Sequence, residues 1–156
     1  MKLCILSDSH GAVRNMIAVI EREKPQLCFF LGDGERDLAA VQAQFPDLPF
    51  YAVRGNCDLR SALSTSLTCV VDGVKIFAVH GHLQQVKYES WPETLCAAAR
   101  AAGADLALFG HTHQAFCAVR DGITLFNPGS VGRGTHPAYG VLTVRDGGFG
   151  TQLKTL

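Results

Sequence analysis

The stretch KLCILSDSHG, residues 2–11, is a near-continuous apolar run that ends abruptly in a polar loop. Because apolar residues then recur at near-helical spacing, the pattern predicts a strand, a loop and a helix in that order. The same pattern recurs at QLCFFLGDGE, residues 26–35, before a helix expected from about Arg36 to Phe45. FYAVRGNCD, residues 50–58, repeats the passage from strand to loop. Three strands that each stop at a polar loop predict a partly parallel sheet with helices covering it.

From residue 65 onward the sequence changes to hairpins. TSLTCVV (65–71) and VKIFAVH (74–80) flank Asp72-Gly73, a dipeptide suited to a tight turn. A helix is expected from Pro92 to Gly103, followed by the apolar run DLALF, and two more strand pairs surround Asp121-Gly122 and Asp146-Gly147. The chain is therefore predicted to be one α/β domain over residues 1–156, with two packed mixed β-sheets flanked by helices.

Composition limits the partners and the compartment. Fourteen acidic residues balance fourteen Lys and Arg residues, so charge favours neither nucleic acid nor an anionic membrane as a partner. The apolar runs are short and no signal-peptide pattern opens the chain, which predicts a cytoplasmic protein. Homo-oligomer formation stays open.

The six cysteines form no CxxC pair. Five of them lie in apolar strands or a helix and are expected to be small buried residues in a reducing compartment: Cys4, Cys28, Cys69, Cys96 and Cys117. The sixth, Cys57, lies in the polar loop GNCD.

Polar side chains gather in the loops that follow the predicted strands. Five of the six histidines lie there, and Asp8, Asp33 and Asn56 occupy equivalent positions. Each alone has a structural explanation: Asp8 as a helix cap, Asp33 and Asn56 as turn residues, a histidine as a hydrogen-bonded group. Together they are expected to converge at the carboxyl ends of the strands, where imidazoles and carboxylates suit divalent first-row metals. Asp33, the acid on the middle loop, is the natural bridge between two such ions.

The blocks DSHG, GDGE, GNCD, HGH, GHTH and NPGS, in this order, resemble the signature of the calcineurin-like metallophosphoesterases. The short length, GNCD and NPGS are similar to the small YfcE-type phosphodiesterase branch. The resemblance implies a four-layer fold and a dinuclear, metal-dependent phosphoesterase that hydrolyses a small phosphate ester. The expected reaction is in-line attack by a hydroxide that bridges two divalent cations, with manganese first and iron, zinc or nickel as alternatives. By position, the resemblance implies one ion at Asp8, His10, Asp33 and His113, and another at Asp33, Asn56, His80 and His111.

Other residues are assigned to substrate and proton transfer. Asn56 and Asp33 are expected to be catalytic as well as metal ligands, and the Asn56 amide is expected to donate to a phosphate oxygen. Cys57 stands where many family members have a histidine, so the proton donor is Cys57, His82 or water. His82 contacts the substrate or orients a metal ligand, and Arg133, in the polar loop after the rigid NPGS turn, is a candidate phosphate contact.

Two other functions compete. One is a non-catalytic interaction scaffold, like the retromer trafficking subunit that shares this fold but looks degenerate at its metal positions. All seven expected positions here hold competent ligands, which weighs against it. The other is a phosphatase with Asp8 as nucleophile, which usually requires a second carboxylate that DSH lacks.

Overall fold

The computed structural model describes all residues 1–156 and contains ten strands, three α-helices and one short 3-10 helix. In chain order they are β1 (Lys2–Leu6), α1 (Val13–Glu23), β2 (Leu27–Phe30), α2 (Glu35–Gln44), β3 (Phe50–Ala52), β4 (Ser66–Val71), β5 (Val74–Val79), η1 (His82–Gln84), α3 (Glu93–Ala101), β6 (Leu106–Leu108), β7 (Ala115–Arg120), β8 (Ile123–Pro128), β9 (Ala138–Arg145) and β10 (Gly148–Thr155).

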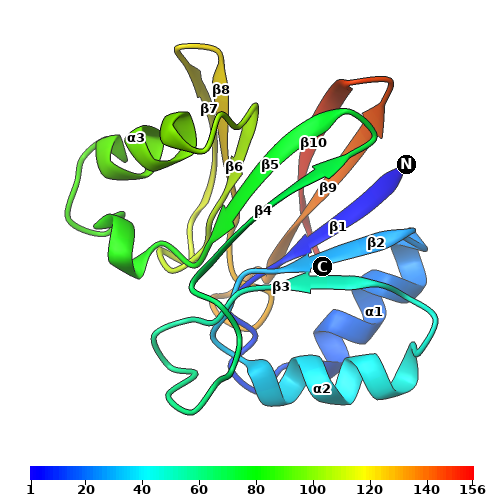
Figure 1. Cartoon of the computed structure of the whole chain (residues 1–156). Coiled ribbons are helices and arrows are strands. Elements are labelled where there is room, and N and C mark those ends of the chain that lie inside the picture. The colour runs from blue at the N-terminus through cyan, green and yellow to red at the C-terminus, as the bar shows by residue number, and fades with distance from the viewer.

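The strands form two five-stranded mixed sheets that pack against each other (Figure 1). The first has the order β10-β9-β1-β2-β3, with β1, β2 and β3 parallel, and the second has the order β4-β5-β6-β8-β7. In the second sheet β5, β6 and β8 are parallel and the outer strands are antiparallel. The predicted two-sheet fold is confirmed.

Three apolar clusters separate four layers. The central cluster joins the sheets, with residues such as Phe29 from the first and Phe126 from the second, both fully buried. A second cluster packs α1 and α2 against the outer face of the first sheet, and a third packs α3 against the second sheet. Full burial of side chains of this size contributes about 1.5–3 kcal/mol each. The clusters therefore hold the sheets and helices in fixed positions, and with them the ends of the strands.

The structure corrects some details of the sequence-based expectations. Helix α1 begins at Val13, so Asp8 does not cap it. Cys4, Cys28 and Cys96 are buried as expected, but Cys69 is only half-buried and Cys117 is exposed. Both exceptions lie on β4 and β7, the edge strands of the second sheet, where apolar neighbours in sequence do not guarantee burial. No helix is both long and apolar enough to cross a membrane.

Candidate metal centre

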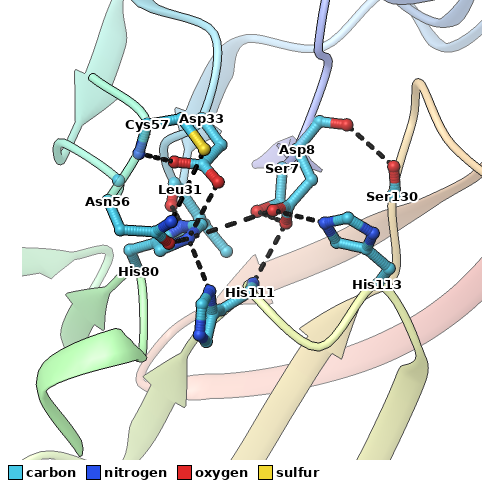
Figure 2. Close-up of polar contacts among 12 residues, drawn as sticks. Ser7, Asp8, Leu31, Asp33, Asn56, Cys57, His80, His111, His113 and Ser130 are labelled. Atoms are coloured by element: carbon cyan, nitrogen blue, oxygen red, sulfur yellow. Dashed lines mark hydrogen bonds and ion pairs between the residues drawn. The ribbon is translucent and has the colours of Figure 1, made fainter. Parts of the chain in front are cut away.

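The predicted metal ligands lie at one end of the two sheets, in the loops that follow five strands, and Figure 2 shows six of them: Asp8, Asp33, Asn56, His80, His111 and His113. Asp8 follows β1, Asp33 follows β2, Asn56 follows β3 and His80 follows β5 directly. His111 and His113 lie in the loop after β6. The parallel strands therefore bring residues more than one hundred positions apart to the same edge.

Left-handed backbone aims these side chains. Asp8, His10 and Asp33 have φ of 55°, 44° and 60°, and His111 and His113 have 68° and 59°. The loops are joined by hydrogen bonds: the Asp8 N–H donates to Gly32 O at 2.9 Å, and the His10 N–H to Asp33 O at 3.2 Å.

One group of metal-competent atoms comes from Asp8, His10 and His113. Asp8 Oδ1 lies 3.1 Å from His113 Nε2 and 3.8 Å from His10 Nε2. The two imidazole nitrogens are 3.4 Å apart. These three side chains are the ones expected to share a metal, together with Asp33.

A second group surrounds His80. His80 Nε2 lies 3.1 Å from Asn56 Oδ1, 3.2 Å from His111 Nδ1 and 3.4 Å from Asp33 Oδ2. Asp33 Oδ2 is also 3.9 Å from His10 Nε2, in the first group. Asp33 therefore lies between the two groups, as its predicted bridging position requires.

Hydrogen bonds from the surrounding chain orient these side chains. His80 Nδ1 donates to Leu31 O at 2.7 Å, which directs Nε2 towards the other site residues. Asp8 Oδ2 accepts from Ser7 Oγ at 2.5 Å and from the His111 N–H at 3.1 Å. Asp33 Oδ1 accepts from the Cys57 N–H at 2.8 Å. Each carboxylate thus uses one oxygen for the protein and presents the other to the centre.

The charge of the site suits cations. Asp8 and Asp33 are 0% and 3% exposed, and neither pairs with a Lys or Arg side chain. Burial lowers the pKa of His80, but the Asp33 hydrogen bond and the Asp8 and Asp33 charges raise it by more. The pKa of His80 therefore lies above its ordinary value. Burial and the His80 charge lower the pKa of His111 to about 4, so its nitrogen carries a free lone pair at neutral pH.

Asp8 Oδ1 is the atom that most directly indicates a metal. It is fully buried and accepts no hydrogen bond, although His113 Nε2 lies 3.1 Å away. An unpaired buried carboxylate oxygen is costly unless a cation compensates it. The donor set of carboxylates, imidazoles and one amide oxygen therefore fits divalent first-row metals.

The remaining predicted residues lie at different distances from this centre. Cys57 Sγ is within 4.8 Å of metal-competent atoms of His10 and Asp33, and burial together with the Asp33 hydrogen bond raises its pKa to about 11. The His82 ring centroid is 5.4 Å from that of His80, and its buried Nδ1 has no partner. Arg133 is exposed and its guanidinium forms no hydrogen bond or ion pair, so its substrate role stays a prediction.

The sequence analysis missed the residues that hold the loops together. Asp58 accepts four backbone hydrogen bonds, from Asp33, Gly34, Glu35 and Gly55, at 2.8–3.0 Å. Its position in GNCD was visible, but its donors belong mainly to another loop and no local pattern identifies them.

NPGS has a similar anchoring function. Asn127 Nδ2 donates to Gly110 O at 2.9 Å, and Ser130 Oγ donates to Asp8 O at 2.7 Å. Asn127 and Pro128 are the last residues of β8, so the expected turn is confined to Gly129 and Ser130. NPGS positions the GHTH loop and Asp8.

Two positively charged side chains lie close enough to the site to affect the pKa values of its histidines. After burial and the His80 charge, Arg54 also lowers the pKa of His82, and Lys87 contributes in the same way at His111. Positive charge around a metal centre favours an anionic substrate.

Comparison with known proteins identifies phosphoesterases as relatives of this chain. The calcineurin-like phosphoesterase superfamily domain matches residues 1–147. The chain is 32% identical over 135 residues to the probable metallophosphoesterase YsnB of Bacillus subtilis, covering 84% of this chain and 75% of YsnB. It is 31% identical to phosphodiesterase YfcE of Escherichia coli in an alignment 169 positions long, which covers 91% of this chain and 87% of YfcE.

Solved structures share the fold. A predicted phosphoesterase from Streptococcus pneumoniae superposes with a TM-score of 0.82 at 27% identity, over 99% of this chain and 88% of that one. Wild-type Vps29 of Entamoeba histolytica, complexed with Zn2+, superposes with a TM-score of 0.78 at 19% identity, over 99% of both chains.

Proposed function

Because the chain belongs to the calcineurin-like phosphoesterase superfamily, we propose that it is a metal-dependent phosphodiesterase acting on a small phosphate ester. The observation that carries the proposal is the pair of buried acids, Asp8 and Asp33, surrounded by histidine nitrogens and without Lys or Arg partners. The preference for a diester is supported by the likeness to phosphodiesterase YfcE. Six unpaired cysteines support a reducing compartment, the cytoplasm.

The proposed ligand sets follow the two groups of side chains. One ion is held by Asp8, His10, Asp33 and His113, and the other by Asp33, Asn56, His80 and His111. Manganese is the proposed metal, and iron, nickel and zinc remain alternatives, zinc because a Vps29 of this fold binds it. Two such cations would lower the pKa of water and neutralise charge that develops on the phosphate.

The chain's own residues bind and orient the substrate. Asn56 Nδ2 contacts only Cys57 Sγ, at 3.5 Å, so it is free to donate to a phosphate oxygen. Asp8 and His80 are held rigidly by Ser7 and Leu31, which fixes the centre before substrate arrives. Cys57, His82 and water remain the candidate proton donors to the leaving group.

The test combines turnover with metal content. Purified protein should hydrolyse bis(p-nitrophenyl) phosphate only with added metal, and elemental analysis should find two ions per chain. Asp33→Asn should lower kcat/KM by about 100-fold or more, because it weakens the carboxylate that both ions share. Exposed Asp47→Asn is the matched control. Undiminished turnover in Asp33→Asn would overturn the mechanism.

The scaffold alternative keeps one supporting observation, since structures of this fold include Vps29, named for vacuolar protein sorting. Metal content alone does not separate the two functions, because one Vps29 structure holds Zn2+. A protein that binds metal but hydrolyses no phosphate ester would favour the scaffold.

A further inference from the structure

A groove beside the metal centre is lined by two arginines that have no part in the proposed metal binding. Its volume is about 660 Å³, and it lies between the start of α2 and the loop after β3. His10, Asp33 and Cys57 line it, as do Arg36 and Arg60. Pockets of roughly 300–1,000 Å³ accommodate whole small molecules. The groove therefore has room for more of a substrate than the phosphate bound at the metals.

Two acids in the groove keep their negative charge but accept hydrogen bonds from the chain itself. Asp58 accepts its four backbone N–H groups, and Asp37 Oδ2 accepts from Ser9 Oγ at 2.6 Å and the Gly11 N–H at 2.7 Å. Asp33, which also lines the groove, is a proposed metal ligand, and Glu35 is the one carboxylate there whose side chain has no partner. Glu35 is therefore the acid that competes most directly with an anion for the two arginines.

The arginines are uncommitted. Neither the Arg36 nor the Arg60 guanidinium forms a hydrogen bond or an ion pair within the chain, and both residues are exposed. At the start of α2, the Gly34 and Glu35 N–H groups already donate to Asp58 and are not available to an anion. An anion that enters the groove would be bound by these two side chains.

We propose that Arg36 and Arg60 bind a second, terminal phosphate of the substrate, so that the preferred substrate is a phosphodiester with a phosphate on one arm. This inference rests on the proposed function. Two guanidinium groups match the charge of about −1.5 to −2 on a terminal phosphate, and their fork geometry suits its oxygens. Leu59, 86% exposed and also lining the groove, offers apolar surface to the linking part of that arm.

The experiment compares thymidine 5′-(p-nitrophenyl phosphate) with the same compound carrying a 3′-phosphate. For wild-type protein with manganese, kcat/KM should be about tenfold higher for the 3′-phosphorylated substrate, as charge-assisted hydrogen bonds from two arginines would give. The double variant Arg36→Gln, Arg60→Gln should reduce this ratio to near one. Glu35→Gln should increase this ratio. Arg145→Gln, at the exposed end of β9, should not change it.

A binding measurement separates this proposal from the phosphodiesterase proposal. Calorimetry should show thymidine 3′,5′-bisphosphate binding the manganese-loaded protein about tenfold more tightly than thymidine 5′-phosphate, with the preference lost in the double variant. That result without turnover would support the phosphate site and contradict the phosphodiesterase. Turnover with equal rates on both substrates, or a preference that survives the double variant, would overturn the phosphate site alone.

Discussion

Single residues at the metal centre adopt a backbone that L-amino acids avoid. Left-handed conformation costs about 1–2 kcal/mol for most residues and less for Asp, whose short side chain tolerates it. Here it occurs at Asp8 and Asp33, and again at His10, His111 and His113. The loop hydrogen bonds and the buried anchors hold these conformations, which direct alternate residues of DSH and HTH into the metal centre.

The two histidines of GHTH are predicted to serve different ions. His111 contacts the His80 group and His113 contacts Asp8, so each single change to Ala should lower metal content from two ions to one. Combining His80→Ala with His111→Ala should still leave one ion, because both changes affect the same ion. Combining His80→Ala with His113→Ala should leave none.

Elemental analysis of the dialysed variants gives the stoichiometry, and exposed His136→Ala is the control. Equal stoichiometry in the two double variants would contradict the separate assignment.

Among the elements, helix α2 is fixed to the site by a residue outside it. Asp58 accepts from Gly34 and Glu35 at the helix start and from Asp33 just before it. Burial raises the pKa of Asp58, but these N–H groups lower it more, to below its ordinary value. The negative charge of Asp58 therefore stabilises both the start of the helix and the loop that carries Asp33.

Asp58→Ala should lower the free energy of unfolding by about 1–3 kcal/mol, because it leaves four backbone donors without their acceptor. Metal affinity should fall as well, since the Asp33 loop loses its anchor. Urea unfolding and metal titration measure the two effects. Exposed Asp47→Ala should change stability by less than about 0.5 kcal/mol. Normal stability in Asp58→Ala would contradict the anchoring function.

Across the whole molecule, Glu23 links the first and last segments of the chain. It lies at the end of α1 with its side chain 5% exposed, and it pairs with Lys2 of β1 at 2.9 Å and Lys154 of β10 at 2.8 Å. Tyr139 of β9 donates to it at 2.9 Å. Burial raises the pKa of Glu23, but hydrogen bonds from Lys154, Lys2 and Tyr139 lower it more, to about 2.

Glu23 should stabilise the folded protein at neutral pH and lose this stabilisation in acid. Its pKa in the folded protein, about 2, is below its ordinary value of 4.5, so its stabilisation is complete above pH 4.5 and is lost as pH falls towards 2. Glu23→Gln should lower the free energy of unfolding at pH 7 by about 1–3 kcal/mol and flatten this pH dependence. Urea unfolding at pH 7 and pH 3 measures both effects, with exposed Glu21→Gln as control. An unchanged acid dependence in Glu23→Gln would assign it to other groups.

Local sequence patterns are sufficient to predict the helices and strands and the residues that could bind a metal. Apolar runs that stop at polar loops predicted the strands, Asp-Gly dipeptides predicted the hairpins, and the chemistry of Asp, His and Asn predicted a metal site at the strand ends. These features are local, because periodicity and turn preference depend on neighbouring residues. The burial of a strand residue is predictable only where the strand lies inside its sheet. Cys117 was expected to be buried but is exposed, because β7 is an edge strand.

Which atoms of these residues meet depends on the packing of the whole chain. This packing paired the Asp8 carboxylate with His113 and the His80 imidazole with His111. It also gave Asp58 its donors and placed both Arg36 and Arg60 in the lining of one groove. Each pairing joins loops that are distant in sequence, and it depends on the register and packing of the two sheets. That long-range geometry is set by the shared apolar core, so no short stretch of sequence contains it.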